Sequence, residues 1–231
     1  IALLCLISIG HADAPVKKVL VDFSRESTAN WTSGEAPIRL IPDAQEPQVK
    51  LHFKDDDRQL TLTKAVSFNL EKSTSVRFRV DITRTETLLE GSLSFKSGNG
   101  WYSKTFTLHD RGLRHLIFSK TEFTPEGKPA GWNQIEAIRL SFWPRATGST
   151  ILLPKSIEAF EDTLWVLDPE PLSETGDEIY TSRVSLRHMD RLLKDLGIPH
   201  AIFPADSMYL SRRPSVVIAP YLPRLPPNLY R

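Results

Sequence analysis

Residues 132–143, with the sequence WNQIEAIRLSFW, constrain the fold of this chain more than any other stretch. After a polar turn, apolar and polar side chains alternate, and the apolar set is Ile138, Leu140 and Phe142. The opposite set is Arg139, Ser141 and Trp143. Because side chains two residues apart on a strand share a face, the pattern predicts a strand with one face in a core. Trp143 then lies on the polar face, where a large apolar ring needs a partner.

The chain is long enough for one large domain or two small ones, with 231 residues. Its hydrophobic content of 40% and charged content of 25% are ordinary for a globular protein. The formal net charge is +1, so no overall field attracts nucleic acid or an anionic membrane. We therefore expect no nucleic-acid partner.

The first residues are typical of a processing signal. The apolar run IALLCLISI is followed by GHADA, which fits the end of a signal peptide that is cleaved after Ala12 or Ala14. A short strand at the start of the domain is the alternative. The run is too short to span a membrane, and no other segment is a candidate, so we expect no membrane span. Residues 1–14 are thus interpreted as a signal peptide remnant of a secreted or periplasmic protein.

Cysteine usage agrees with that interpretation. The only cysteine, Cys5, lies in the predicted signal, so the mature chain has no disulfide or thiolate ligand. A secreted domain without disulfides favours a bacterial envelope or extracellular protein.

Residues 15–160 have the pattern of an all-β domain. The clearest strand is 75–83, where Val76, Phe78, Val80 and Ile82 alternate with polar residues. The turn sequence SGNG at 97–100 predicts a hairpin. The other expected strands are 19–23, 38–41, 49–53, 59–63, 91–96, 101–108, 113–118, 135–143 and 150–157. Many short strands without a helical period predict a mainly β fold, an antiparallel β-sandwich (jelly roll).

Residues 161–231 follow a different pattern. The apolar run 164–167 is typical of a buried parallel strand, and 200–203 and 215–219 are two further strands. Between the first two we predict a loop over 168–178 and a helix capped by Thr181 or Ser182 that ends at Gly197. The expected buried stripe of this helix is Met189, Leu192, Leu193 and Leu196. Because one helix cannot cover both faces of a parallel sheet, we expect a truncated parallel α/β domain.

Residues 19–160 resemble galactose-binding-like jelly rolls that occur as carbohydrate-binding modules. The resemblance rests on the opening VDF at 21–23, on FSKTEF at 118–123, and on WNQI at 132–135 leading into IRLSF at 138–142. It implies a sugar-binding sandwich. Such modules often have an acidic residue just before a closing Ile in a calcium site, whereas this chain has Lys155 or Ser156 there. We therefore expect no metal site.

Residues 164–231 resemble the first third of a class I glutamine amidotransferase-like (flavodoxin-like) domain of bacterial glycosidase-associated proteins. The segment VVIAPY at 216–221 carries this resemblance. In that family the nucleophile lies later in the chain, so no residue here takes its role.

The candidate sugar site consists of outward-facing side chains. Trp101 and Trp143 fall on polar strand faces, and flat rings stack on sugars while charged groups bond their hydroxyls. The charged candidates beside them are Arg79, Arg139, Arg77 and Asp81. The alternative is that the tryptophans lie under loops or at an interface with the second domain. His115 alternates with apolar neighbours, which predicts a buried or sheet-edge position.

No catalytic motif is found, and we expect no cofactor. The chain has no G-x-S-x-G elbow, no H-E-x-x-H and no glycine-rich phosphate loop. The acidic run 55–57 is typical of a solvated hairpin tip more than of a calcium site. Three functions remain: a non-catalytic carbohydrate-binding module that takes a polysaccharide or oligosaccharide, a positioning domain that packs on the α/β domain, or part of an enzyme whose active site lies beyond residue 231.

Overall fold

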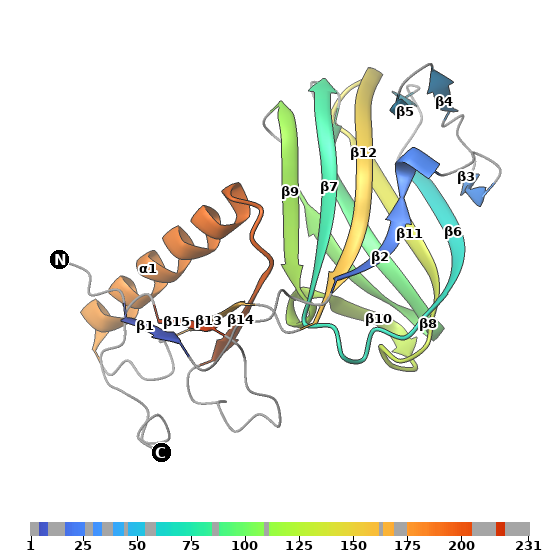
Figure 1. Cartoon of the computed structure of the whole chain (residues 1–231). Coiled ribbons are helices and arrows are strands. Elements are labelled where there is room, and N and C mark those ends of the chain that lie inside the picture. Colours follow the sequence, from blue (N-terminus) through green and yellow to red (C-terminus); the bar gives the residue numbers. More distant parts are fainter. Residues whose placement is uncertain are drawn as a thin grey trace.

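The computed structural model shows a β-sandwich beside a small second unit that contains the single helix of the described residues (Figure 1). The residues that the structure describes are 5–8, 17–25, 30–33, 39–43, 46–53, 59–84, 88–108, 111–161, 164–168, 175–204 and 216–219.

The first layer of the sandwich, called here the front sheet, has the strand order β4-β5-β12-β7-β9. β2 pairs with the C-terminal half of β12, and β5 pairs with its N-terminal half. The strands are β2 (Lys17–Asp22), β4 (Arg39–Asp43), β5 (Glu46–Phe53), β7 (Ser75–Arg84), β9 (Gly112–Ser119) and β12 (Gly148–Phe160).

The second layer, called here the back sheet, has the order β10-β8-β11-β6-β3. Every pairing within the two layers is antiparallel, which confirms the predicted sandwich. The strands are β3 (Thr32–Ser33), β6 (Leu60–Phe68), β8 (Leu88–Phe106), β10 (Thr124–Pro129) and β11 (Ile135–Pro144). Two 3-10 turns, η1 (Phe23–Arg25) and η3 (Lys120–Glu122), join strands.

The core lies between the two sheets and follows the predicted alternation. Ile138, Leu140 and Phe142 of β11 are fully buried, as are the apolar residues of β7. Aromatic rings of both sheets pack together there. The ring centres of Phe78 in β7 and Phe106 in β8 are 6.0 Å apart. The rings of Trp132 and Tyr102 stack with their centres 4.3 Å apart, and both pack against this core.

The single long strand β8 contains the expected hairpin. The hydroxyls of Ser94 and Ser103 are 3.0 Å apart, although nine residues of straight strand would separate them by about 30 Å. The strand therefore reverses between them, at the predicted glycine turn, where Gly98 has a φ of +54°.

Two strands of the sandwich, β3 and β10, were not expected. β10 contains Pro125, Gly127 and Pro129, which argue against a strand in the interior of a sheet. The structure places β10 at the edge of the back sheet, where it pairs with β8 alone among the described strands. An edge strand needs backbone N–H donors on one side only, so it tolerates proline.

The second unit is a four-stranded sheet with the order β1-β15-β13-β14. β13 (Leu164–Asp168) pairs in parallel with both β14 (His200–Pro204) and β15 (Val216–Ala219), as a β-α-β unit requires. β1 (Cys5–Ser8) pairs antiparallel with β15. Residues 5–8 of the predicted signal segment thus take the alternative form, a strand, and cleavage of residues 1–14 stays a prediction. The irregular piece expected near residues 205–212 lies outside the described residues.

The helix α1 (Gly176–Asp195) begins earlier than predicted. Thr175 is its N-cap, since its hydroxyl accepts from the Glu178 N–H while the Glu178 carboxylate accepts from the Thr175 N–H. This T-x-x-E capping box was the missed signal. Gly197 ends the helix with a φ of +67°, as expected.

The buried stripe of α1 also differs from the prediction. Leu193 is buried, but Leu192 and Leu196 are 51% and 63% exposed. The buried residues of α1 are Ser182 and Leu193, and Leu186 and Met189 between them are partly buried. Within the described ranges, no helix is long and apolar enough to cross a membrane.

We predict that Gly197→Ala destabilises the second unit by about 1–3 kcal/mol. The left-handed φ of Gly197 strains an alanine, and an added Cβ would lie 2.8 Å from the Nδ1 of His115. Hydrogen exchange of the α1 and β14 amides measures the loss. The matched control is Gly176→Ala, whose Cβ meets nothing within 4 Å; equal protection in both variants would contradict the prediction.

Candidate functional site

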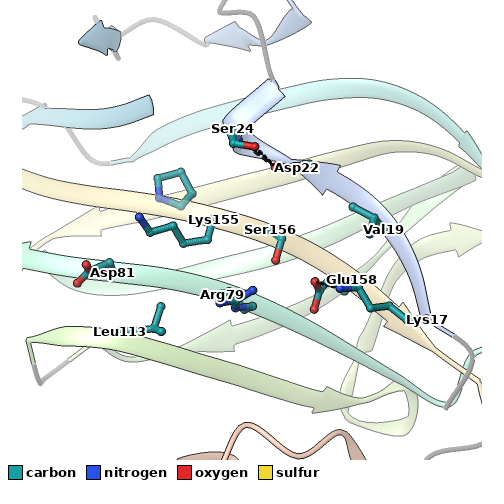
Figure 2. Close-up of a pocket in the computed structure, with 11 residues that line it drawn as sticks. Lys17, Val19, Asp22, Ser24, Arg79, Asp81, Leu113, Lys155, Ser156 and Glu158 are labelled. Atoms are coloured by element: carbon teal, nitrogen blue, oxygen red, sulfur yellow. Dashed lines mark hydrogen bonds and ion pairs between the residues drawn. The ribbon is translucent and has the colours of Figure 1, made fainter. Parts of the chain in front are cut away.

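A groove with a volume of about 580 Å³ lies on the outer face of the front sheet (Figure 2). β2 forms one side, β12 and β7 form the floor, and β9 forms the other side. The residues that line it are Lys17, Val19, Asp22, Ser24, Arg79, Asp81, Leu113, Pro154, Lys155, Ser156 and Glu158.

Arg79 and Ser156 face each other across β7 and β12 at the floor of the groove. The Nε of Arg79 and the Oγ of Ser156 are both buried, and neither has a hydrogen-bond partner within the described part of the chain. Ser156 is only 7% exposed. Most buried polar groups in proteins are paired, so two unpaired neighbours in one groove indicate a place for a ligand or water.

Glu158 lies beside this pair, and a cation of the protein faces each of its carboxylate oxygens. Its Oε1 is 2.8 Å from the Nζ of Lys17, and its Oε2 accepts from the Nε and Nη2 of Arg77 at 2.8 and 2.6 Å. Burial is the largest influence on this carboxyl and raises its pKa, but the hydrogen bonds and charges of the two cations outweigh it. The pKa of Glu158 is therefore lowered, and the residue is a carboxylate in the folded protein.

Arg77 also joins the sandwich to the second unit. Its Nη1 donates to the carbonyl of Gly197 at 2.7 Å, and its guanidinium lies 4.8 Å from the centre of the Phe160 ring. His115, opposite Arg79 on the edge strand β9, packs against the same glycine. Burial and the charges of Arg77 and Arg79 lower the pKa of His115, so its imidazole is neutral near pH 7.

A second ion cluster holds α1 to β14. The Nε2 of His200 is 2.9 Å from Asp190 Oδ1, and its Nδ1 is 3.0 Å from the Ile198 carbonyl. Lys194 donates to the other oxygen of Asp190 at 2.9 Å. Burial raises the pKa of Asp190, but His200 and Lys194 together lower it further than burial raises it. This cluster fixes the position of the turn that carries Gly197.

The predicted sugar-site residues do not form one surface. Arg77, Arg79 and Asp81 lie on the outer face of the front sheet, and Arg79 and Asp81 line the groove. The other three, Trp101, Arg139 and Trp143, belong to strands of the back sheet. The core of the sandwich separates the two groups, because the two sheets pack through their inner faces.

On the back sheet, Arg139 covers Trp101. The guanidinium lies 4.1 Å from the centre of the indole ring, and its Nη2 is 3.6 Å from the Glu126 carboxylate. Trp143 is four residues farther along β11, about 13 Å away. One face of Trp101 is thus occupied by a cation of the protein itself, as cation–π pairs require.

The sequence did not single out the residues of β2 and β12 that complete the groove. Ser156 and Glu158 alternate with the buried Ile157 and Ala159, and this alternation indicates that Ser156 and Glu158 lie on the outer face. The register of β12 against β7 shifts between Pro154 and Ser156, so alternation alone does not give the facing partners. Within the described ranges, no three His, Cys, Asp or Glu side chains cluster as a metal site would require, and residues 55–57 lie outside those ranges.

No protein-family model matches this chain, and no curated protein matches it. Solved structures do. A family 11 carbohydrate-binding module from Clostridium thermocellum, in complex with a β-1,3-1,4-mixed-linked tetrasaccharide, is 15% identical with a TM-score of 0.47. That match covers 65% of this chain and 98% of the module.

Two other solved structures match this chain at similarly low identity. A carbohydrate-binding module specific for non-crystalline cellulose is 15% identical with a TM-score of 0.43, over 62% of this chain and 93% of the module. An agarase is 12% identical with a TM-score of 0.49, over 77% of this chain but only 31% of the enzyme. Matches at these identities and TM-scores do not identify a ligand. The resemblance of residues 164–231 to an amidotransferase-like domain finds no support in these comparisons.

We predict that Glu158→Gln lowers stability by about 3 kcal/mol at pH 7, since it leaves two cations without their buried partner. The contribution of Glu158 is present above its unfolded pKa of roughly 4.3 and is lost as the pH falls through the lower folded value. Urea unfolding of the normal protein should therefore show a loss of stability below about pH 4.3 that is smaller in the variant.

The matched control is Glu136→Gln. Glu136 is 37% exposed and lies 3.6 Å from Lys96, so its loss should cost less than about 1 kcal/mol. Equal effects of the two substitutions would show that the Glu158 cluster is no stronger than a surface pair.

Proposed function

We propose that the sandwich binds a polysaccharide or oligosaccharide in the groove of the front sheet. It does so as a non-catalytic module of a larger secreted bacterial protein that takes part in polysaccharide breakdown. The observation that carries the proposal is that the Nε of Arg79 and the Oγ of Ser156 are buried and unpaired at the floor of a groove of about 580 Å³. That volume lies within the range of roughly 300–1,000 Å³ that small-molecule sites occupy.

The chemistry of the lining suits a ligand rich in hydroxyl groups. Arg79 supplies donors, and Asp81, two residues away on the same face of β7, supplies an acceptor. Val19 and Leu113 are 48% and 47% exposed on opposite sides of the groove, where the C–H faces of sugar rings would contact them. Unpaired buried donors gain most from such a ligand, because they have no hydrogen bond to give up.

The back face is the competing site. It offers Trp101, Trp143 and Arg139, but Arg139 covers one face of Trp101, and none of these three side chains lines the groove of the front sheet. The two surfaces lie on opposite sides of the core, so substitutions separate them cleanly.

We predict that the double variant Arg79→Ala, Asp81→Ala loses retardation by at least one polysaccharide in affinity electrophoresis. The expected change is at least about tenfold in affinity, the value of one charged hydrogen bond. The full chain is run against a panel of plant, algal and microbial polysaccharides.

The double variant Trp101→Ala, Trp143→Ala is the matched control. Unchanged retardation there assigns the site to the groove. Loss of retardation only in the tryptophan variant would assign it to the back face, and no retardation of the normal protein on the whole panel would reject the binding function.

A second candidate is a positioning role without sugar binding. The hydrogen bond from Arg77 to Gly197 and the packing of His115 on that glycine favour it. We predict that Arg77→Leu increases hydrogen exchange of α1 and β14 amides by about tenfold, while Arg139→Leu leaves it unchanged. Equal exchange in both variants would speak against this role.

A further inference from the structure

We propose that the ligand of the groove carries an acidic substituent, a carboxylate or a sulfate ester on a sugar ring, which accepts hydrogen bonds from Arg79 and Ser156. This inference rests on the proposed function and adds the class of glycan to it.

The two floor groups select for an acceptor. The Nε of Arg79 can only donate, and the hydroxyl of Ser156 beside it is also unpaired. Both atoms are shielded from solvent, so a ligand reaches them only with a change of side-chain rotamer. A group with two negatively charged oxygens satisfies both donors, and it matches the planar fork of an arginine better than a single hydroxyl does.

Two of the three carboxylates that line the groove already face cations of the protein. Both oxygens of Glu158 already face cations, Lys17 on one side and Arg77 on the other. Asp22 accepts from the backbone N–H and hydroxyl of Ser24, and Arg25 lies 3.5 Å from it.

Arg79 is therefore the cation at the floor that these two carboxylates do not face, and it has no ion pair with a described residue (Figure 2). The third carboxylate of the lining, Asp81, lies two residues from Arg79 and is placed to accept from a hydroxyl of the same sugar ring.

The lining also lacks the usual source of affinity for neutral sugars. None of the described residues that line the groove is aromatic, so no ring stacking by them contributes there. Charged hydrogen bonds, each worth more than neutral ones, must supply the affinity instead.

The test compares matched ligands by calorimetry on the full chain. Polygalacturonate is compared with its methyl ester, and a sulfated galactan is compared with its desulfated form. We expect at least one acidic member to bind about tenfold or more tightly than its neutral partner, and we expect added salt to weaken that preference. The two pairs distinguish carboxylate from sulfate.

Arg79→Gln keeps a donor but removes the charge, and Ser156→Ala removes the hydroxyl. Arg79→Gln should abolish the preference, so that acidic and neutral partners bind with about equal affinity. Ser156→Ala should lower the affinity for the acidic ligands only. The control Arg139→Gln, a cation of the opposite face, should leave the preference intact, and circular dichroism confirms that each variant is folded.

Equal binding of acidic and neutral partners would overturn this inference and leave the glycan-binding function standing. A preference that persists in Arg79→Gln would also overturn it. Absence of binding to either pair and to the polysaccharide panel would overturn both the inference and the proposed function.

Discussion

The ion cluster around Glu158 is the interaction on which the arrangement of this protein depends. One buried carboxylate connects Lys17 of β2 and Arg77 of β7 to β12. Arg77 in turn binds the Gly197 carbonyl in the turn between α1 and β14. A buried carboxylate is costly without partners, so the cluster requires the three strands to stay together. The hydrogen bond from Arg77 joins the second unit to them.

The same cluster determines what the groove can do. It removes Arg77 from the set of side chains that a ligand can reach and leaves Arg79, two residues farther along β7, without a partner for its Nε. Neighbouring arginines on one strand face thus take different roles, one in structure and one in proposed recognition. Their difference comes from the strands beside them, because Glu158 lies opposite Arg77 whereas Ser156 lies opposite Arg79.

The back sheet illustrates how a surface tryptophan can be explained without a sugar. The alternation in β11 placed Arg139 outside the core, and the adjoining strands bring it over Trp101. The partly buried ring of Trp101, on a polar strand face, therefore has a partner within the protein. Trp101 and Trp143 remain a prediction for a site, with the groove as its competitor.

The sequence by itself determined the strands, because a two-residue period is a local property that each strand carries in its own side chains. It predicted the inward faces of β7 and β11, the glycine turn within β8 and the β-α-β order of the second unit. It missed β3, and it missed β10, whose prolines and glycine are untypical of a strand. It also missed the first turn of α1, which the capping box at Thr175 signals. Only the tertiary structure decided which outward faces meet, since the predicted residues divided between two sheets that the core holds apart. Register across β12, which a local shift at Pro154 alters, brought Ser156 to Arg79 and Glu158 to Arg77, and no single strand contains that information.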